Sequence, residues 1–132
     1  MMHVLGLEVP PEVLMASTGF RGGGGGFLAQ CGALNAGIMN VGLLFGRTRA
    51  DESNECASEI TRLLCQRFQD AMGHLTCEVL RDVYQCGNRE DPRSDTVYYA
   101  GAKLATEVLL SAHHHCAVCG GFEGAVNRQL AS

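Results

Sequence analysis

The sequence predicts an all-α fold, a single-domain irregular bundle of five to six helices over residues 1–132, with a Gly-rich loop before the central helix. Three observations support this prediction. Apolar residues recur at steps of three and four in several stretches, which is the period of a helix face. No stretch shows the sustained apolar–polar alternation of a strand. A length of 132 residues suits one domain with a substantial core.

The central helix is predicted directly after five consecutive glycines, Gly22–Gly26, which cannot hold a regular element because glycine lacks a restricting side chain. Cys31 stands at the start of this helix. Gly32, Gly37 and Gly42 weaken it by about 1 kcal/mol each relative to Ala, which is tolerable if the helix is buried and something approaches its backbone closely. The expected buried face comprises Ala33, Leu34, Ile38, Val41, Leu44 and Phe45. The stretch is therefore interpreted as a flexible loop that delivers a thiol to the start of a buried helix.

Two helices are predicted on either side of this segment. The first begins at Pro10 or Pro11, where a missing N–H costs nothing, and ends at Gly19. The next begins after an Asp51 cap and runs to about Met72, before a terminating glycine. Its apolar stripe comprises Cys56, Ile60, Leu63, Leu64, Phe68 and Met72.

The remaining part of the chain contains a short helix, a loop, a long helix and a last helical element. Thr76 is predicted to cap a helix over Cys77–Tyr84. Cys86–Asp95 is polar and contains a proline, which indicates a loop. A long helix is expected from Thr96 to about His114, and a final element starts near Cys119. The inward residues of the long helix are expected to be Val97, Ala100, Leu104, Val108 and Leu109.

Charge and hydropathy argue against several classes of partner. The net charge is −4 and there is no Lys/Arg cluster, so neither nucleic acid nor an anionic membrane is expected as a partner. The longest apolar run, around Ile38 to Phe45, is shorter than the roughly 20 residues that span a bilayer. Met1–Pro11 lacks the features of a signal peptide, so we expect a cytoplasmic protein if the chain is complete and allow a periplasmic one if an upstream segment was removed.

Seven cysteines are the most informative residues of the chain. They amount to about 5%, below the level of a disulfide scaffold, and an odd number cannot pair completely within one chain. Redox chemistry, metal ligation or inert burial must therefore account for at least some of them. The seven are Cys31, Cys56, Cys65, Cys77, Cys86, Cys116 and Cys119.

The order of these motifs resembles a known family. GFRGGGGGFLAQCGALNAG, then GHLTCEVL around Cys77, then the closing CAVC of Cys116 and Cys119, is similar to redox-active proteins named for a C…GCAxxG…C…C pattern. The same domain resembles the non-haem part of split-Soret cytochrome c. The resemblance implies an all-helical fold, electron-transfer or thiol-redox work, a homodimer, and an iron–sulfur cluster on clustered cysteines as one form of the site.

Two departures from the family pattern limit what carries over. No cysteine precedes Cys31, so chemistry that needs an upstream thiol is not carried over to this chain. Gly120 follows Cys119, whereas covalent c-type haem requires C-x-x-C-H, so no such haem is expected.

The candidate catalytic and metal-ligating residues are Cys31, Cys77, Cys116 and Cys119. Cys31, Cys77 and Cys119 are expected at or near helix N-termini, where the positive end of the dipole lowers a thiol pKa and favours the thiolate. A thiolate is both the nucleophile of disulfide exchange and a ligand for iron or zinc. Backbone N–H groups of the glycine segment are expected to be free to hydrogen-bond to sulfur in a cofactor site, which gives four candidate cofactor-binding residues: Gly24, Gly25, Gly26 and Gly32.

The other cysteines and the histidines have plainer interpretations. Cys56 and Cys65 are interpreted as small core residues of an amphipathic helix. Cys86, beside the loop, is either free or a substitute for the missing upstream thiol, and the former is favoured. The run His113, His114 and His115 is interpreted as a solvated helix end, with metal ligation as the alternative.

Three functions remain open from the sequence. The first is a thiol-redox protein, either a thiol oxidoreductase or an electron-transfer protein, that cycles a disulfide among the four candidate cysteines and works with a redox partner protein. The second is an iron–sulfur electron carrier on the same cysteines. The third is a non-catalytic or zinc-stabilised helical module.

Overall fold

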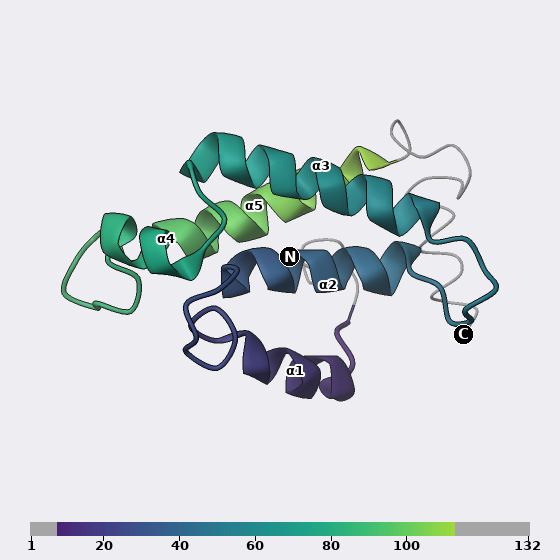
Figure 1. Cartoon of the computed structure of the whole chain (residues 1–132), viewed down its shortest axis with the longest axis horizontal. Coiled ribbons are helices and arrows are strands. Elements are labelled where there is room, and N and C mark those ends of the chain that lie inside the picture. The colour runs from purple at the N-terminus through teal and green to yellow at the C-terminus, as the bar shows by residue number, and fades with distance from the viewer. Residues whose placement is uncertain (1–7, 113–132) are drawn as a thin grey trace.

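The computed structural model describes residues 8–112 and confirms the all-α prediction. Within these residues the chain forms five α-helices and one short 3-10 turn (Figure 1). In chain order they are α1 (Pro11–Ser17), the turn η1 (Thr18–Phe20), α2 (Gly32–Phe45), α3 (Glu55–Met72), α4 (Cys77–Tyr84) and α5 (Thr96–Leu110).

Helices α2, α3 and α5 pack on one another and form the core of the described residues. In Figure 1 α1 lies along the opposite side of α2 from α3, and α4 lies at one end of the bundle beside the start of α5. Burial of large apolar side chains, each contributing about 1.5–3 kcal/mol, stabilises the bundle. The largest fully buried side chains come from all of α2 to α5, and they are Phe68, Leu34, Ile60, Leu64, Leu80, Leu109, Val41, Val97 and Val108.

The predicted faces of α2 and α3 are the faces that the structure buries. The cap of α3 was predicted wrongly: Asn54, and not Asp51, occupies the N-cap. Asp51 instead forms an ion pair with Arg49 at 2.8 Å in the preceding turn. The helix ends at Gly73 with φ +85°, as expected. The buried residues of the predicted sets are Leu34, Val41, Leu44 and Phe45 on α2, and Cys56, Ile60, Leu64 and Phe68 on α3.

Close helix packing explains why α2 has a glycine at position 37, although glycine weakens a helix. A Cβ at Gly37 would lie 3.1 Å from Leu64 and 3.2 Å from Ala105, so α3 and α5 approach this part of the α2 backbone. Nothing lies within 4 Å of a Cβ at Gly42, so the expected close approach does not occur there.

Two further helix ends differ from the prediction. Gly19 does not end the first helix as expected. Helix α1 ends at Ser17 with Thr18 as its C-cap, and Gly19 lies within η1. Helix α5 ends at Leu110 rather than near His114. Its buried residues include Gly101 and Ala105, whereas the predicted Ala100 and Leu104 are only partly buried.

Some sequence-based expectations fall outside the described residues. These are the histidine run at 113–115, the Cys116/Cys119 pair and the final element expected after Cys119. Among the helices that the structure describes, none is both long enough and apolar enough to cross a membrane.

Candidate redox site

The glycine segment forms a compact loop that only glycine can build readily. All five residues of Gly22–Gly26 have positive φ, between +60° and +92°, a region that costs other residues roughly 1–2 kcal/mol each. The loop folds back on itself, because Leu28 N–H donates to Gly22 O at 2.9 Å and Ala29 N–H donates to Gly23 O at 3.0 Å. The chain then reaches Cys31, the N-cap of α2, in a non-helical conformation.

This exit segment pairs with the residues that precede α4. Gln30 and Thr76 form an isolated antiparallel bridge. On either side of it, Cys31 N–H donates to Leu75 O at 2.8 Å and Cys77 N–H donates to Ala29 O at 2.7 Å. Two helix starts that are far apart in the sequence are thereby held side by side.

The pairing also decides how the two cysteines face. Neighbouring residues in extended chain point to opposite sides, so Cys31 and Cys77 lie on the same side of the bridge, opposite to Gln30 and Thr76. They form a diagonal pair, for which the Cα separation is roughly 7–8 Å. A disulfide requires a Cα separation of about 4.4–6.8 Å. A disulfide between Cys31 and Cys77 therefore requires the two helix starts to approach each other.

A cavity of about 890 Å³ opens at this junction. Three cysteines line it: Cys31, Cys77 and Cys86. Its other walls come from η1, the glycine loop, the start of α2, α4 and the start of α5. All three cysteines are free thiols, with Cys31 buried and the other two partly exposed. The junction therefore gathers three thiols around one space that a small molecule could enter.

Two glycines are required for this close packing. A Cβ at Gly23, where φ is +74°, would lie 2.8 Å from the Cβ of Cys77 and 2.6 Å from Ala29 N. A Cβ at Gly32 would lie 2.6 Å from Phe20 O. The loop and η1 thus pack directly against the residues at the two helix starts, and larger side chains would push them apart.

The expectation of free N–H groups in the glycine loop is wrong for three of its residues. Gly24 N–H donates to Phe20 O, Gly25 N–H to Gly19 O and Gly26 N–H to Arg21 O. These groups serve the loop itself and are not available to sulfur. Gly32 differs because it is the first residue of α2. The first helical hydrogen bond of α2 is donated by Asn35 N–H to Cys31 O, so the N–H of Gly32 has no partner within the helix.

The predicted lowering of the thiol pKa is also wrong for Cys77, although Cys77 is the first residue of α4 as expected. Burial raises the pKa of the Cys77 thiol, the nearby Cys31 raises it further, and Arg81 acts in the opposite direction. Desolvation disfavours the charged thiolate, and at Cys77 it is the largest cause of the raised pKa.

The Cys86 thiol shows the same effect. Its pKa is raised by burial first and then by Cys31 and Cys77. The pKa of Tyr98 is also raised, by burial and then by the three thiols. The S–H group of Cys86 donates a hydrogen bond to Leu80 O at 3.7 Å, and the thiol therefore lies against α4. The three thiols and the phenol therefore share one electrostatic environment.

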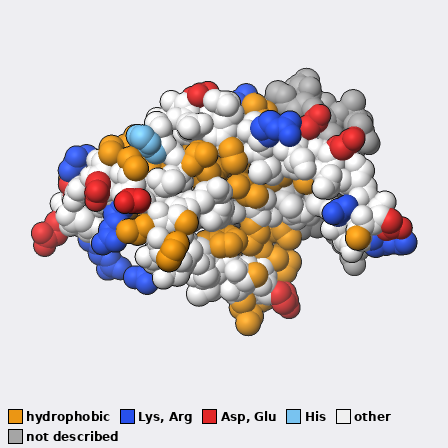
Figure 2. Space-filling view, in the orientation of Figure 1, with side chains coloured by type: hydrophobic (Ala, Val, Ile, Leu, Met, Phe, Trp, Pro, Cys, Tyr) orange, Lys and Arg blue, Asp and Glu red, His pale blue; other side chains and the backbone are white. Residues whose placement is uncertain are grey.

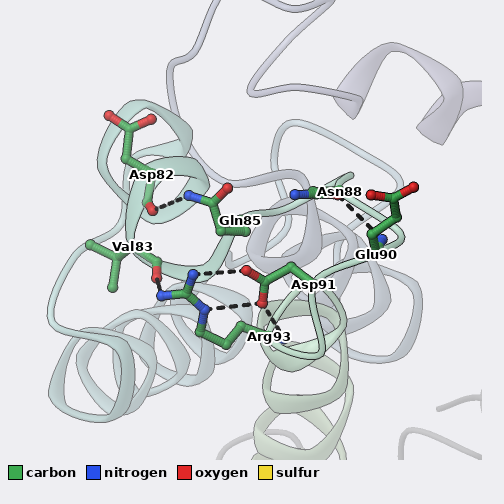
Figure 3. A network of polar contacts seen from close by, with 7 residues as sticks. All are labelled: Asp82, Val83, Gln85, Asn88, Glu90, Asp91 and Arg93. Carbon is green, nitrogen blue, oxygen red and sulfur yellow. Dashed lines mark hydrogen bonds and ion pairs between the residues drawn. The ribbon is translucent and has the colours of Figure 1, made fainter.

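Beyond Cys86, the loop is closed by Arg93, whose guanidinium makes two bonds to Asp91 and a third to Val83 O (Figure 3). The side-chain amide of Gln85 donates to Asp82 O at 2.8 Å in the same network. The segment predicted as a polar loop is thus a hydrogen-bonded structure that fixes one wall of the cavity.

The structure places the predicted cysteines unevenly. It brings Cys31 and Cys77 together, and it adds Cys86, which the sequence favours only as a free thiol. Cys65 lies on α3, packed against the core and not in the cavity lining, as expected. Cys56 is buried as expected, but it is disulfide-bonded. The predicted partners Cys116 and Cys119 lie outside the described residues.

Sequence reasoning missed the cavity role of Cys86 and also of Arg81 and Tyr98. Arg81 follows Cys77 by one helical turn, a spacing at which side chains meet, and this was an available signal. For Cys86 and Tyr98 the sequence offers no such signal, because their positions depend on the loop that joins α4 to α5.

The described residues do not form a metal site by themselves. Within residues 8–112, no group of three or more His, Cys, Asp or Glu side chains is placed so that it could hold a metal ion. An iron–sulfur cluster in its common forms requires four cysteine ligands, one more than the three thiols that line the cavity.

Comparison with known protein families gives a match over most of the chain. The model of the family described as putative redox-active protein (C_GCAxxG_C_C) matches residues 2–108. This span contains all three cavity cysteines and ends before Cys116. No curated protein and no solved structure matches.

Proposed function

Since the chain belongs to the family of putative redox-active proteins with the C_GCAxxG_C_C pattern, we propose that it carries electrons by reversible thiol/disulfide chemistry in the cavity. The observation that supports this proposal is the presence of three free thiols, Cys31, Cys77 and Cys86, around one space. Cys65, the other free cysteine of the described residues, does not line this cavity.

Cys77 is the thiol that first attacks a partner disulfide. It is partly exposed at the cavity, whereas Cys31 is buried, and Arg81 opposes the rise in its pKa that burial causes. The thiolate attacks one sulfur of the partner disulfide, the partner's S–S bond breaks, and one partner thiolate leaves. The product is a mixed disulfide on Cys77.

Cys31 resolves this intermediate from the buried side of the cavity. After losing its proton to solvent, it attacks the Cys77 sulfur, the mixed disulfide breaks, and the second partner thiolate leaves. In sum, two protein thiols are oxidised to one disulfide, the partner disulfide is reduced to two thiols, and two electrons pass between them. The place of both cysteines on the same side of the Gln30–Thr76 bridge favours this pair for closure.

Cys86 is the third member of the site and competes with Cys31 for the same intermediate. The family pattern has further cysteines after its GCAxxG segment, and Cys86 lies within the matched residues, whereas Cys116 and Cys119 do not. We therefore add Cys86 to the proposed site, and the roles expected for Cys116 and Cys119 stay predictions.

Thiol counting tests the proposal. The reduced protein is treated with hydroxyethyl disulfide, a neutral probe, and the bonds formed are mapped by mass spectrometry. We expect a disulfide among the cavity cysteines that dithiothreitol reverses. The double variant Cys31→Ser/Cys86→Ser should trap the mixed disulfide on Cys77, because no cavity thiol is left to resolve it, and Cys77→Ser should abolish fast reaction. The matched control is Cys65→Ser, which removes a free thiol outside the cavity and should react as the wild type does. If the control and Cys77→Ser behave alike, the proposal is wrong.

The iron–sulfur alternative is decided by the same samples. Anaerobically purified protein that absorbs in the visible region and contains iron and sulfide would favour a cluster and would displace the disulfide proposal. Colourless protein with zinc bound and no reversible disulfide would favour the helical module without turnover.

A further inference from the structure

Two arginines accompany the thiols in the cavity wall. Arg21 belongs to the start of the glycine loop and Arg81 to α4, and both residues are exposed. Within residues 8–112 neither arginine forms an ion pair, whereas Arg49 and Arg93 each pair with an aspartate. Of the described residues that line the cavity, Asp82 is the one carboxylate.

The charge of this wall is opposite to that of the whole chain. Two arginines and one aspartate give the described lining a net charge of +1, whereas the chain carries −4. In Figure 2 basic side chains gather at the lower left of the face shown, below the position of α4 in Figure 1. A guanidinium without a protein partner presents a planar fork that matches a carboxylate, and it prefers such a partner to water alone.

The volume of the cavity limits the size of its ligand. About 890 Å³ is at the upper end of the range for small-molecule pockets and is too small for a folded partner. Cys77 and Cys86 are partly exposed at this cavity, whereas Cys31 is buried. A ligand that enters would meet the arginines and a partly exposed thiol together.

We propose that the cavity takes a low-molecular-weight disulfide that bears carboxylates, with Arg21 and Arg81 binding the carboxylates while Cys77 attacks its S–S bond. This inference rests on the proposed thiol/disulfide function and names its substrate class. The balance is that of the two-step exchange above: the small disulfide gains two electrons and is released as two thiols, and the protein gains one disulfide.

The test uses three small disulfides that differ in charge. Dithiodipropionate is anionic, cystamine is cationic and hydroxyethyl disulfide is neutral. Rates of oxidation of the reduced protein are measured with each. We expect the anionic probe to react about tenfold faster than the cationic one, as Coulomb attraction at a partly exposed site allows. The preference should fall as salt is raised, because exposed charges are screened.

Arginine variants separate the local effect from the overall charge. Arg81→Gln and Arg21→Gln should each reduce the ratio of anionic to cationic rates about threefold or more. The control Arg62→Gln changes the net charge by the same amount on α3, outside this cavity, and should leave the ratio unchanged. The ratio is the correct measure because Arg81 also acts on the Cys77 pKa, and a change in thiolate content alters all three rates alike.

The outcomes distinguish a failure of this inference from a failure of the proposed thiol/disulfide function. Reaction with all three probes at equal rates, after correction for their intrinsic reactivity, would overturn the inference and leave the thiol/disulfide function standing. A faster cationic probe would also overturn it. No reaction with any probe would overturn both.

Discussion

Cys31 and Cys77 each donate a backbone N–H to the segment that carries the other, Cys31 to Leu75 O at 2.8 Å and Cys77 to Ala29 O at 2.7 Å. These reciprocal bonds flank the bridge between Gln30 and Thr76. They fix the starts of α2 and α4 against each other through the backbone. The site therefore depends on a few backbone hydrogen bonds and on the glycine loop that packs over them.

Gly23→Ala should destabilise the protein more than Gly24→Ala. Both residues have positive φ, which costs alanine about 1–2 kcal/mol. At Gly23 the new Cβ would also meet Cys77 and the Ala29 backbone at distances of 2.6 to 2.9 Å, whereas nothing lies within 4 Å at Gly24. Urea unfolding should show the difference, and alkylation of Cys77 should be altered only in Gly23→Ala. Equal losses of stability in the two variants would show that the loop does not press on Cys77.

Alkylation of Cys77 should require a higher pH than alkylation of an ordinary thiol. Burial, followed by the effect of Cys31, raises the pKa of Cys77 above the usual value of about 8.5. Iodoacetamide labelling followed by peptide mapping measures the midpoint directly. Arg81→Gln should move the midpoint further up, because this arginine favours the thiolate, and Arg62→Gln should not. A midpoint below about 8.5 would contradict the dominance of burial.

The raised pKa of Cys77 also makes stability depend on pH. A thiol whose pKa is raised by folding contributes stability that is fully present below the pKa of the unfolded chain. That contribution is lost as the pH rises through the folded-state pKa. Urea unfolding should therefore show stability falling on the alkaline side of about pH 8.5, and less steeply in Cys77→Ser. Identical alkaline slopes in the variant and the wild type would be evidence against this coupling.

Asp91→Asn should weaken the protein near neutral pH and not in strong acid. The hydrogen bonds from Arg93 lower the pKa of the Asp91 carboxyl to about 2. Its contribution is therefore present above the unfolded pKa of about 4 and disappears as the pH falls through about 2. Unfolding midpoints of variant and wild type, measured from neutral to acidic pH, should converge at the acidic end.

Asp51→Asn provides the comparison for this ion pair. Arg49 and Asp51 are paired at the same distance of 2.8 Å, but their side chains are 72% and 67% exposed. Pairs of this kind contribute little, so Asp51→Asn should change the midpoint less than Asp91→Asn does near neutral pH. An equally large effect at Asp51 would mean that the loop network around Arg93 has no special role.

We also expect a homodimer in solution, as the split-Soret resemblance implied. The described surface exposes Leu14, Met15 and Phe27, with Phe27 85% exposed. Figure 2 shows hydrophobic side chains gathered over the region of α1. Such side chains commonly mark an interface. Light scattering at moderate concentration should give twice the mass of one chain, and Phe27→Ser should lower it toward that of a monomer. A wild-type monomer would exclude this expectation.

Much of the helical framework follows from the sequence. The repeat of apolar residues predicts the buried stripes of α2 and α3, and Thr76 followed by Cys77 predicts α4 with its observed bounds. The run of five glycines before Cys31 predicts a loop that ends at a buried helix start. These features depend on local preferences of the backbone and on the burial of one helix face. Both are determined by residues that are close together in the sequence.

The composition of the site was decided by tertiary structure. Nothing near Gln30 indicates that it pairs with Thr76, because pairing between distant segments depends on how the whole chain closes. The place of Cys86 in the cavity depends on the loop that Arg93 and Asp91 hold. The direction of the Cys77 pKa shift also required the fold. A helix start by itself lowers a thiol pKa, but burial is a property of the packed molecule, and at Cys77 burial is the largest cause of a raised pKa.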